Sequence, residues 1–240
     1  MNLSNNKIII TGGASGIGLG LTERFIKENN TVIICGRREE VLEEASAKFP
    51  GVITKVCDIS NEAERTELFN WVEANHPDLN VLVNNAGIQN WVNVADEGFI
   101  EKAEDEIAIN IVAPLHLSNL FLKLKGLTTI MNVTSGLAFV PLSKVPVYCA
   151  TKAFMRSFTL SLRYQLKSTN TEVIEIIPPA LNTDLGGKGI HDEHPPVSDF
   201  VESIFKQLQE GKVELTFGTS GSRAEANNAT ISEYFNRMNP

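Results

Sequence analysis

The sequence predicts an α/β fold in which helices cover both faces of a doubly wound, mainly parallel sheet of seven strands. Seven short runs of apolar and β-branched residues recur along the 240 residues, and segments of helical length and period separate them. The runs are almost continuously apolar, as is typical of parallel strands that are buried on both faces. Repeated alternation of strand and helix favours a doubly wound α/β domain.

The strands are expected in order along the chain, each on one apolar run. Between the third and fourth, residues 61–74 have a helical period, because Leu68, Trp71 and Val72 can share one face. No repeat, low-complexity tract or interdomain linker interrupts the alternation, so we expect a single domain over residues 1–240. The predicted strands are 7–10 (KIII), 31–35 (TVIIC), 52–56 (VITKV), 80–83 (NVLV), 127–133 (LTTIMNV), 171–177 (TEVIEII) and 213–217 (VELTF).

Composition argues against several classes of protein. The formal net charge of −8 disfavours a nucleic-acid binder, whose affinity rests on neutralising phosphates. No basic run suggests binding to an anionic membrane surface, and no segment approaches the roughly 18 apolar residues of a membrane helix. The start, MNLSNNKIIITGG, has too short an apolar run for a signal peptide. Cys35, Cys57 and Cys149 lack metal-ligand spacing, so we expect reduced thiols, no metal site and a cytoplasmic protein.

A glycine-rich turn follows the first predicted strand. In TGGASGIG (11–18), Gly12, Gly16 and Gly18 form the pattern G-x-x-x-G-x-G. Such a turn lets a strand pass sharply into a helix, brings the backbone close to a pyrophosphate and directs helix N–H groups at the anion. A tight strand–helix turn without a ligand is the alternative, and three glycines after the first strand make it the weaker one.

The end of the second strand, CGRR (35–38), indicates which dinucleotide is bound. An NAD-binding domain usually places Asp or Glu about 20 residues after the glycine turn, where it binds the ribose 2′-hydroxyl. Here Arg37 and Arg38 occupy this strand end, and a guanidinium suits a 2′-phosphate. We therefore expect NADP(H) in preference to NAD(H), although both arginines could instead begin the solvated helix that continues as EEVLEE.

Tyr148 and Lys152, in YCATK, are four residues apart and lie on one face of any helix that contains them. Such a pair also occurs by chance, so the spacing alone is weak evidence.

Together these motifs resemble the short-chain dehydrogenase/reductase (SDR) family. TGGASGIG, NNAG (84–87), Ser135 and Tyr148-x-x-x-Lys152 follow the family's order over essentially the whole chain. Ser135 precedes Tyr148 by the family's spacing of thirteen residues. The stretch IPPALNTDLGGKG is also similar to a DltE-like branch of bacterial oxidoreductases.

The resemblance implies a Rossmann-type three-layer αβα sandwich and gives individual residues a role. Asp58 would contact the adenine and Thr183 the nicotinamide carboxamide. The catalytic residues that it implies are Asn110, Ser135, Tyr148 and Lys152. The cofactor-binding residues are Gly12, Ser15, Gly16, Ile17, Gly18, Arg37, Asp58, Ile59, Asn84, Ala86, Gly87, Tyr148, Lys152, Pro178 and Thr183.

In this family Tyr148 would exchange a proton with the substrate oxygen. Lys152 would lower the pKa of Tyr148 from its usual value near 10 and bind the nicotinamide ribose. Ser135 would hydrogen-bond the substrate oxygen, and Asn110 would hold a water that links Lys152 to solvent. Without the resemblance, Ser135 is read as a turn residue or helix cap and Asn110 as a packing residue.

One motif departs from the family, which usually has Pro-Gly where this chain has Pro178-Pro179. The second proline removes the φ freedom and the N–H of a glycine, so the geometry of this loop stays open. The resemblance places residues 137–145, Trp91 and a loop at 185–196 beside the substrate, which favours a partly apolar carbonyl compound. Ordinary packing would explain these apolar residues equally well, and the loop's His191 and His194 are expected to be solvated. A loop of this length is more often a functional lid than a simple connector.

The sequence thus predicts an NAD(P)(H)-dependent oxidoreductase that interconverts a ketone or aldehyde with an alcohol. Its partner would be a small molecule, with no nucleic acid, no membrane and no metal. Family members associate through the helices that carry Asn110 and Tyr148, so a homodimer or homotetramer is expected. The C-terminal segment can also form an apolar face of Ile231, Tyr234, Phe235 and Met238. The alternative is a non-catalytic NADP-binding sensor, which has no need of Ser135, Tyr148 and Lys152 together.

Overall fold

The computed structural model describes residues 1–239, and its centre is a sheet of seven strands in the order β3-β2-β1-β4-β5-β6-β7. Every neighbouring pair of strands is parallel, so the predicted doubly wound sheet is confirmed. Each predicted strand is present, with bounds that differ by at most a few residues. The strands are β1 (Lys7–Thr11), β2 (Thr31–Gly36), β3 (Ile53–Val56), β4 (Val81–Asn84), β5 (Thr129–Val133), β6 (Glu172–Ile177) and β7 (Glu214–Thr216).

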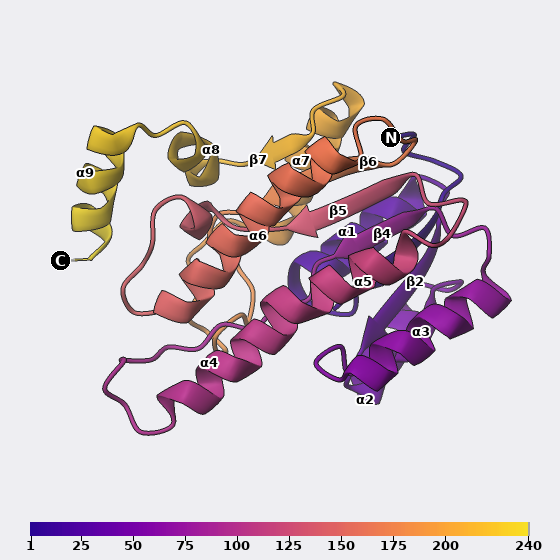
Figure 1. The fold of residues 1–240 in the computed structure, drawn as a ribbon, viewed down its shortest axis with the longest axis horizontal. Coiled ribbons are helices and arrows are strands. Elements are labelled where there is room, and N and C mark those ends of the chain that lie inside the picture. The colour runs from indigo at the N-terminus through magenta and orange to yellow at the C-terminus, as the bar shows by residue number, and fades with distance from the viewer. Residues whose placement is uncertain (240) are drawn as a thin grey trace.

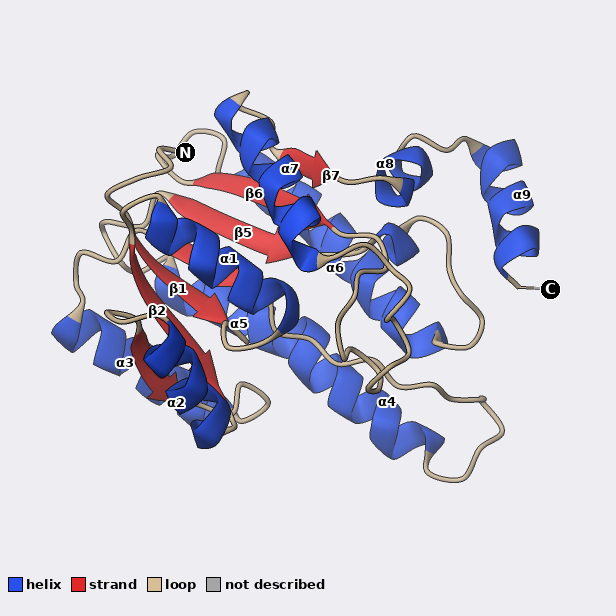
Figure 2. Cartoon of the chain, turned by 180° about the vertical axis from the view of Figure 1, so that it is seen from behind, coloured by secondary structure: helices blue, strands red, loops and turns tan. Residues whose placement is uncertain are grey.

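Helices form a layer on each side of the sheet. Figure 1 looks onto the face covered by α3, α5 and α6, and Figure 2 shows the opposite face with α1, α2 and α7. The α-helices are α1 (Gly16–Lys27), α2 (Glu39–Lys48), α3 (Glu62–Asn75), α4 (Phe99–Ile107), α5 (Ala113–Phe121), α6 (Pro146–Gln165), α7 (Val197–Gln209), α8 (Thr219–Ala224) and α9 (Asn228–Met238). A π-helical turn, η1 (Ala108–Val112), joins α4 to α5, and a 3₁₀ turn, η2 (Gly136–Ala138), follows β5.

The near-continuous apolar character of the strands is explained by two cores, one on each face. Ile8 and Ile10 of β1 pack in the core that contains Phe25 of α1, whereas Ile9 packs in the opposite core with Phe121 of α5. Successive strand residues point to opposite faces, so a strand buried on both faces must be apolar at every position.

The strand order reverses direction between β1 and β4, which are neighbours in the sheet although two strands and three helices separate them in sequence. Ligands of doubly wound folds bind at the carboxyl ends of strands beside such a switch point. The glycine turn leaves β1 here and the NNAG segment leaves β4 here, so the topology brings both predicted motifs to one edge.

The structure also locates the loop predicted at 185–196 and the predicted apolar segment at the C-terminus. The connection between β6 and α7 is irregular throughout, from residue 178 to residue 196, and so begins earlier than the predicted loop at 185–196. The C-terminal helix α9 is formed, stands away from the sheet in Figure 1 and has no buried residue. Among the described residues, no helix combines the length and apolar character that a membrane-spanning segment needs.

Candidate active site

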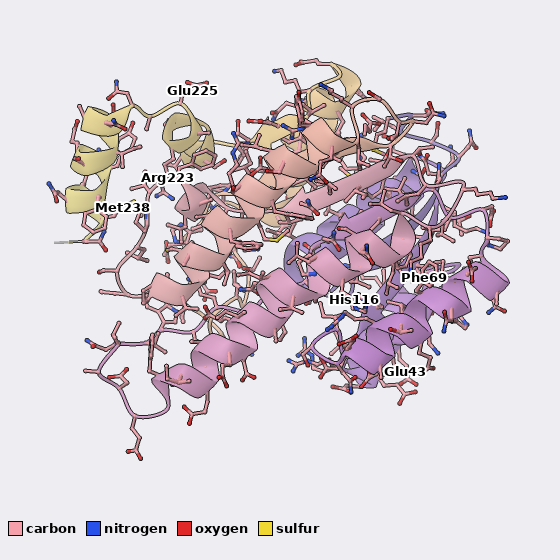
Figure 3. All side chains as sticks on the ribbon, in the orientation of Figure 1. Glu43, Phe69, His116, Arg223, Glu225 and Met238 are labelled. Carbon is pink, nitrogen blue, oxygen red and sulfur yellow. The ribbon has the colours of Figure 1, made fainter. Side chains whose placement is uncertain are left out.

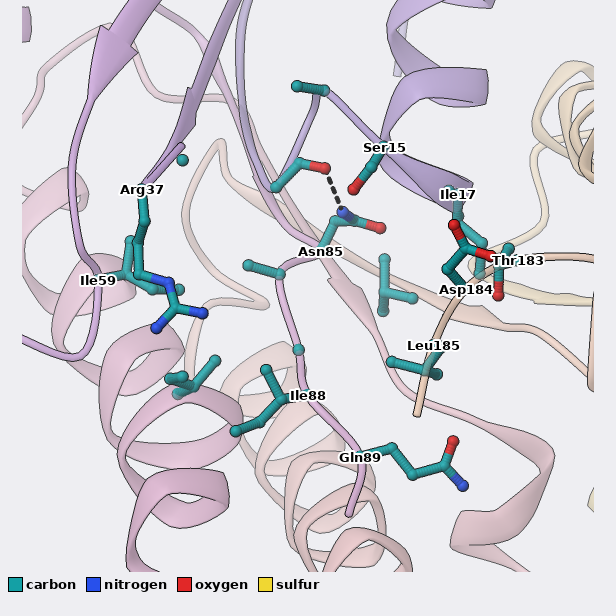
Figure 4. Close-up of a pocket in the computed structure, with 18 of the residues that line it drawn as sticks. Ser15, Ile17, Arg37, Ile59, Asn85, Ile88, Gln89, Thr183, Asp184 and Leu185 are labelled. Carbon is teal, nitrogen blue, oxygen red and sulfur yellow. Dashed lines mark hydrogen bonds between the residues drawn. The ribbon is translucent and has the colours of Figure 1, made fainter. Parts of the chain in front are cut away.

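A cavity of about 890 Å³ runs along the carboxyl ends of the strands, and we call it the main cavity. Figure 4 shows Arg37 and Ile59 on one side of it, and Thr183, Asp184 and Leu185 on the other. Its walls are the glycine turn after β1, the end of β2, the start of the segment after β3, residues 85–90 after β4, one face of α6 and residues 182–187 after β6.

The glycine turn forms one wall because its backbone adopts conformations that other residues avoid. Gly12 has φ 64° and Gly16 has φ 50°, both in the left-handed region where glycine carries no penalty. Gly18 has a different role, since a Cβ there would lie 2.2 Å from the carbonyl oxygen of Gly12. Gly12 and Gly16 line the main cavity, whereas Gly18 lies beneath it and allows α1 to pack closely on the turn.

The end of β2 contributes an exposed cation. Arg37 lines the main cavity and forms no ion pair with any acid of residues 1–239. Arg38 lines the cavity as well, at the start of α2. Asp58 and Ile59, after β3, line the cavity too, and Figure 4 shows Ile59 beside Arg37. A guanidinium without an acid partner at this strand end fits a ligand that brings its own negative charge.

Helix α6 carries Tyr148 and Lys152 on one face, where both are buried and both line the main cavity. The Lys152 ammonium lies 5.5 Å from the centre of the Tyr148 ring, and its Nζ donates a hydrogen bond of 2.9 Å to the carbonyl oxygen of Val133. Burial lowers the pKa of Lys152 to about 8, so a small change in its surroundings alters its charge near neutral pH.

The phenol of Tyr148 does not show the lowered pKa that the motif predicts. Burial raises the pKa of Tyr148 well above its usual value, and a hydrogen bond with the Ser135 side chain opposes that rise only in part. The Lys152 ammonium faces the ring and bonds the backbone of β5, and it does not offset the loss of hydration. Lowering this pKa therefore needs a further positive charge in the cavity.

Asn110 lies in the π-helical turn η1, directly beneath the cavity. Its Oδ1 accepts the N–H of Ile88 at 2.9 Å, and its Nδ2 donates to the carbonyl oxygen of Ile88 at 2.9 Å and to Thr151 Oγ1 at 3.2 Å. A Cβ at Gly87 would lie 3.2 Å from Asn110 Oδ1 and 3.5 Å from Lys152 Nζ, so a glycine is what lets these groups approach. Single π-helical turns often mark functional sites.

Most of the predicted site residues come together, and four do not line the main cavity. Asn84 is buried beneath it, where its amide bonds Ser118 Oγ at 3.1 Å and Asn132 Oδ1 at 2.9 Å. The four are Gly18, Asn84, Asn110 and Ser135. Those that line it are Gly12, Ser15, Gly16, Ile17, Arg37, Asp58, Ile59, Ala86, Gly87, Tyr148, Lys152, Pro178 and Thr183.

Sequence reasoning missed Asn85, the second asparagine of NNAG. It lines the main cavity and its Nδ2 donates to the carbonyl oxygen of Thr11 at 2.9 Å, which joins the end of β4 to the glycine turn. The signal was available, because neighbouring residues at a strand end point in opposite directions and only one can face the cavity. Gln89, Asn90 and residues 184–187 also line the cavity and carry no motif.

The loop after β6, which contains Pro179, contacts the turn after β5 and the glycine turn. The carbonyl oxygen of Pro178 accepts the N–H of Gly136 at 2.9 Å, and a methyl carbon of Thr183 lies 3.5 Å from the position that a Cβ at Gly16 would take.

Residues 137–145 do not line the main cavity; Leu137, Leu142 and Val145 pack with Tyr148 and Leu185 instead. His191 and His194 lie outside the cavity as well, with ring centres 5.4 Å apart. The described residues contain no group of His, Cys, Asp or Glu arranged to hold a metal.

A parallel doubly wound sheet with a glycine turn opening onto a cavity at its switch point defines a dinucleotide-binding α/β protein. The chain belongs to the short chain dehydrogenase family, whose family model matches residues 6–194. It is 42% identical over 250 residues to the uncharacterized oxidoreductase DltE of Bacillus subtilis (strain 168), with 100% of this chain and 98% of that protein covered. The resemblance to a DltE-like oxidoreductase is thereby confirmed.

Other relatives share parts of the chain or its fold. The chain is 31% identical over 177 residues to the NADP-dependent 3-hydroxy acid dehydrogenase YdfG of Shigella flexneri, with 71% of each chain covered. A short chain dehydrogenase from Burkholderia cenocepacia in complex with NADP matches with a TM-score of 0.83 at 24% identity, over 99% of each chain. A Burkholderia phymatum homologue in complex with NAD matches with a TM-score of 0.82 at 16% identity, over 100% of this chain and 97% of that one. At these identities the two structures show likeness of fold.

Proposed function

We propose that the protein is an NADP(H)-dependent oxidoreductase that interconverts a ketone or aldehyde with an alcohol, with Tyr148 as the proton donor and acceptor. The observation that carries the proposal is that Tyr148 and Lys152 line the same cavity as the glycine turn and Arg37. A proton source, a buried cation and a surface suited to a dinucleotide thus meet in one space.

A dinucleotide fits the main cavity on two observations. The backbone of Gly12 and Gly16 presents a surface without side chains, followed by the first N–H groups of α1, which suits a pyrophosphate. Arg37 offers an unpaired guanidinium where the 2′-phosphate of NADP would lie, and the NADP-dependent relative supports this choice over NAD. Asp58 and Ile59 would border the adenine, Lys152 would bind the nicotinamide ribose and Thr183 the carboxamide.

In this proposal a nicotinamide held by these residues would supply or accept the hydride at the carbonyl carbon. Tyr148 gives a proton to the substrate oxygen in the direction of reduction and takes it back in oxidation. Ser135, which bonds the phenol, also positions the substrate oxygen. Lys152 holds its proton between the ribose and the phenol, and Asn110 fixes the backbone of Ile88 beneath them.

The test is a panel of ketones and aldehydes with NADPH and NADH, on wild type and on Tyr148→Phe. Turnover by wild type that is lost in the variant supports the proposal. The competing function is a non-catalytic NADP sensor. It is favoured if NADPH binds tightly and no compound of the panel turns over.

The unpaired guanidinium of Arg223 favours a substrate that carries a carboxylate. Of the arginines that are at least partly buried, Arg24, Arg65, Arg156 and Arg163 bond acids or carbonyl oxygens; Arg223 has no such partner among residues 1–239. It lies on α8 beside the turn that follows Ser135, its Cδ being 3.4 Å from where a Cβ of Gly136 would lie (Figure 3). A partly buried guanidinium without a partner is costly, and an anion would stabilise it. The related YdfG is named for 3-hydroxy acids.

We expect Arg223→Gln to raise KM about tenfold for carbonyl substrates with a carboxylate, and to leave KM for neutral carbonyl substrates unchanged, because one charge-assisted hydrogen bond is lost. Steady-state kinetics with matched acid and amide substrates measure this. Lys206→Gln, an exposed charge change on α7, is the control. An equal effect on both substrates would argue against a carboxylate site.

A homodimer or homotetramer is proposed through the face formed by α4, η1 and α6. Six large apolar side chains are exposed there, more than isolated surface residues explain. We expect Phe154→Glu to shift the protein to monomer in light scattering or sedimentation, whereas Phe235→Glu on α9 leaves the oligomer intact. The reverse result would place the contact at α9. The six residues are Ile100, Ile107, Val112, Phe154, Leu160 and Tyr164.

We also infer a cytoplasmic location, because Cys35, Cys57 and Cys149 are all buried as free thiols. Free thiols persist in reducing compartments.

A further inference from the structure

Glu106 is an acid buried next to the candidate active site, at the end of α4 and one helical turn before Asn110. Its side chain is 1% exposed, and it forms no ion pair with any of residues 1–239. One carboxylate oxygen, Oε2, is buried without a hydrogen-bond partner among those residues. Burying a carboxylate without full pairing costs free energy, so we looked for a role of Glu106 that explains its burial.

The other oxygen holds a wall of the main cavity. Glu106 Oε1 accepts the backbone N–H of Asn90 at 2.5 Å, and the Asn90 amide donates to the carbonyl oxygen of Lys102 on the same helix at 3.3 Å. Gln89 and Asn90 both line the main cavity. Gln89 also approaches the opposite wall, since its Oε1 lies 3.3 Å from the position of a Cβ at Gly186. Glu106 therefore fixes the segment that closes the cavity beyond Tyr148.

The same carboxylate acts on the phenol through space. Helix α4 packs against α6, and from α6 the titratable groups Tyr148 and Cys149 face Glu106. Burial is the main cause of the raised pKa of both groups, and a negative charge on Glu106 raises it further. Two cations lie near these groups: Lys152 on α6 faces the Tyr148 ring and bonds the carbonyl oxygen of Val133, and Arg223 on α8 interacts with Cys149. Neither forms an ion pair with Glu106.

Glu106 loses its proton at a higher pH than an ordinary glutamate does. Burial raises its pKa, and the bonds from Asn90 oppose that rise only in part. The neutral acid loses less hydration on burial than the carboxylate, so the unpartnered Oε2 is where a proton is held most easily.

We propose that Glu106 is a positioning residue that fixes the cavity wall at Gln89 and Asn90, and that its charge raises the pH at which Tyr148 forms a phenolate. The inference rests on the proposed function, in which Tyr148 must lose a proton for alcohol oxidation. Ionised Glu106 opposes that loss and protonated Glu106 permits it.

The first experiment compares the pH profile of kcat/KM for alcohol oxidation in wild type, Glu106→Gln and Glu106→Leu. Glutamine keeps an acceptor for the Asn90 N–H and removes the charge, so we expect KM to stay within about twofold and the apparent pKa of the rising limb to fall by roughly half a unit or more. Leucine also removes the acceptor, and we expect KM to rise about tenfold in addition because the wall is released. Glu104→Gln, an exposed acid on the same helix, should reproduce the wild-type profile.

The second experiment needs no turnover, and so separates this inference from the proposed function. A group whose folded-state pKa is raised stabilises the folded state at pH values below its unfolded pKa, and that contribution is lost as pH rises through the folded pKa. Denaturant unfolding of wild type and Glu106→Gln should therefore show the variant gaining relative stability as pH rises above about 4.5, the ordinary pKa of a glutamate.

A wild-type pH profile in Glu106→Gln would overturn the electrostatic role, and an unchanged KM in Glu106→Leu would overturn the positioning role. If wild type turns over no substrate, the proposed function fails and takes the role toward Tyr148 with it. The unfolding experiment still decides whether Glu106 is a buried, titrating acid.

Discussion

Tyr148→Phe should lower kcat by about three orders of magnitude while the affinity for NADPH stays within about threefold. The phenol is the titratable group in the main cavity that can deliver a proton beside Ser135, and positioned acid–base groups contribute about 10²- to 10⁴-fold to rate. Phenylalanine keeps the ring, which is 6% exposed and packs with Val145 and Cys149. Fluorescence titration of NADPH and the rate of its oxidation measure the two quantities separately.

The matched control is Tyr164→Phe, which removes a hydroxyl from the same helix at a side chain that is exposed. It should leave both kcat and NADPH affinity unchanged. Wild-type turnover in Tyr148→Phe would exclude Tyr148 as the proton donor. A parallel loss of NADPH affinity would show that the phenol serves binding more than proton transfer.

Arg37→Asp should weaken NADPH binding about a hundredfold and leave NADH binding the same or better. The guanidinium is exposed at the end of β2 without an acid partner in residues 1–239, so it is available to a 2′-phosphate. The aspartate would repel that phosphate and could instead accept the 2′-hydroxyl of NADH. Dissociation constants of both cofactors should be measured at one ionic strength, since exposed charge pairs are screened by salt.

Lys48→Asp makes the same charge change at the far end of α2, away from the cavity, and should affect both cofactors little. If Arg37→Asp weakens NADPH and NADH equally, the selectivity for NADP lies elsewhere, with Arg38 the next residue to test.

Local chemistry made the fold predictable. The centre of β1, Ile8 to Ile10, is continuously apolar because both faces of the strand are buried, and this pattern is visible without coordinates. Gly12 and Gly16 were equally visible as glycines after the first strand, and their φ values of 64° and 50° lie in the left-handed region that favours glycine. Topology then brings the glycine turn, Arg37 and Tyr148 to one edge of the sheet.

The features that the sequence did not reveal depend on how deeply a side chain is buried and on which way it points. The spacing of Tyr148 and Lys152 predicts that they are neighbours, but the net effect on the pKa of Tyr148 depends on how much water both have lost. Glu106 lies within the polar run EKAEDE, where nothing marks it as the buried member. The choice between Asn84 and Asn85 depends on which side of β4 faces the cavity.

The burial of Lys152 beside β5 has a consequence for the stability of the whole molecule. An unfolded chain would hold this ammonium in water with a pKa near 10.5, whereas burial lowers it to about 8 in the folded chain. Below about pH 8 both states carry the proton, and the folded state bears the whole cost of burying the cation, roughly 3 kcal/mol. That cost fades as pH rises toward 10.5, because the folded state releases its proton first. At neutral pH the buried ammonium therefore lowers the free energy of unfolding, and a bound ligand that offers Lys152 an acceptor would stabilise the fold as well as occupy the site.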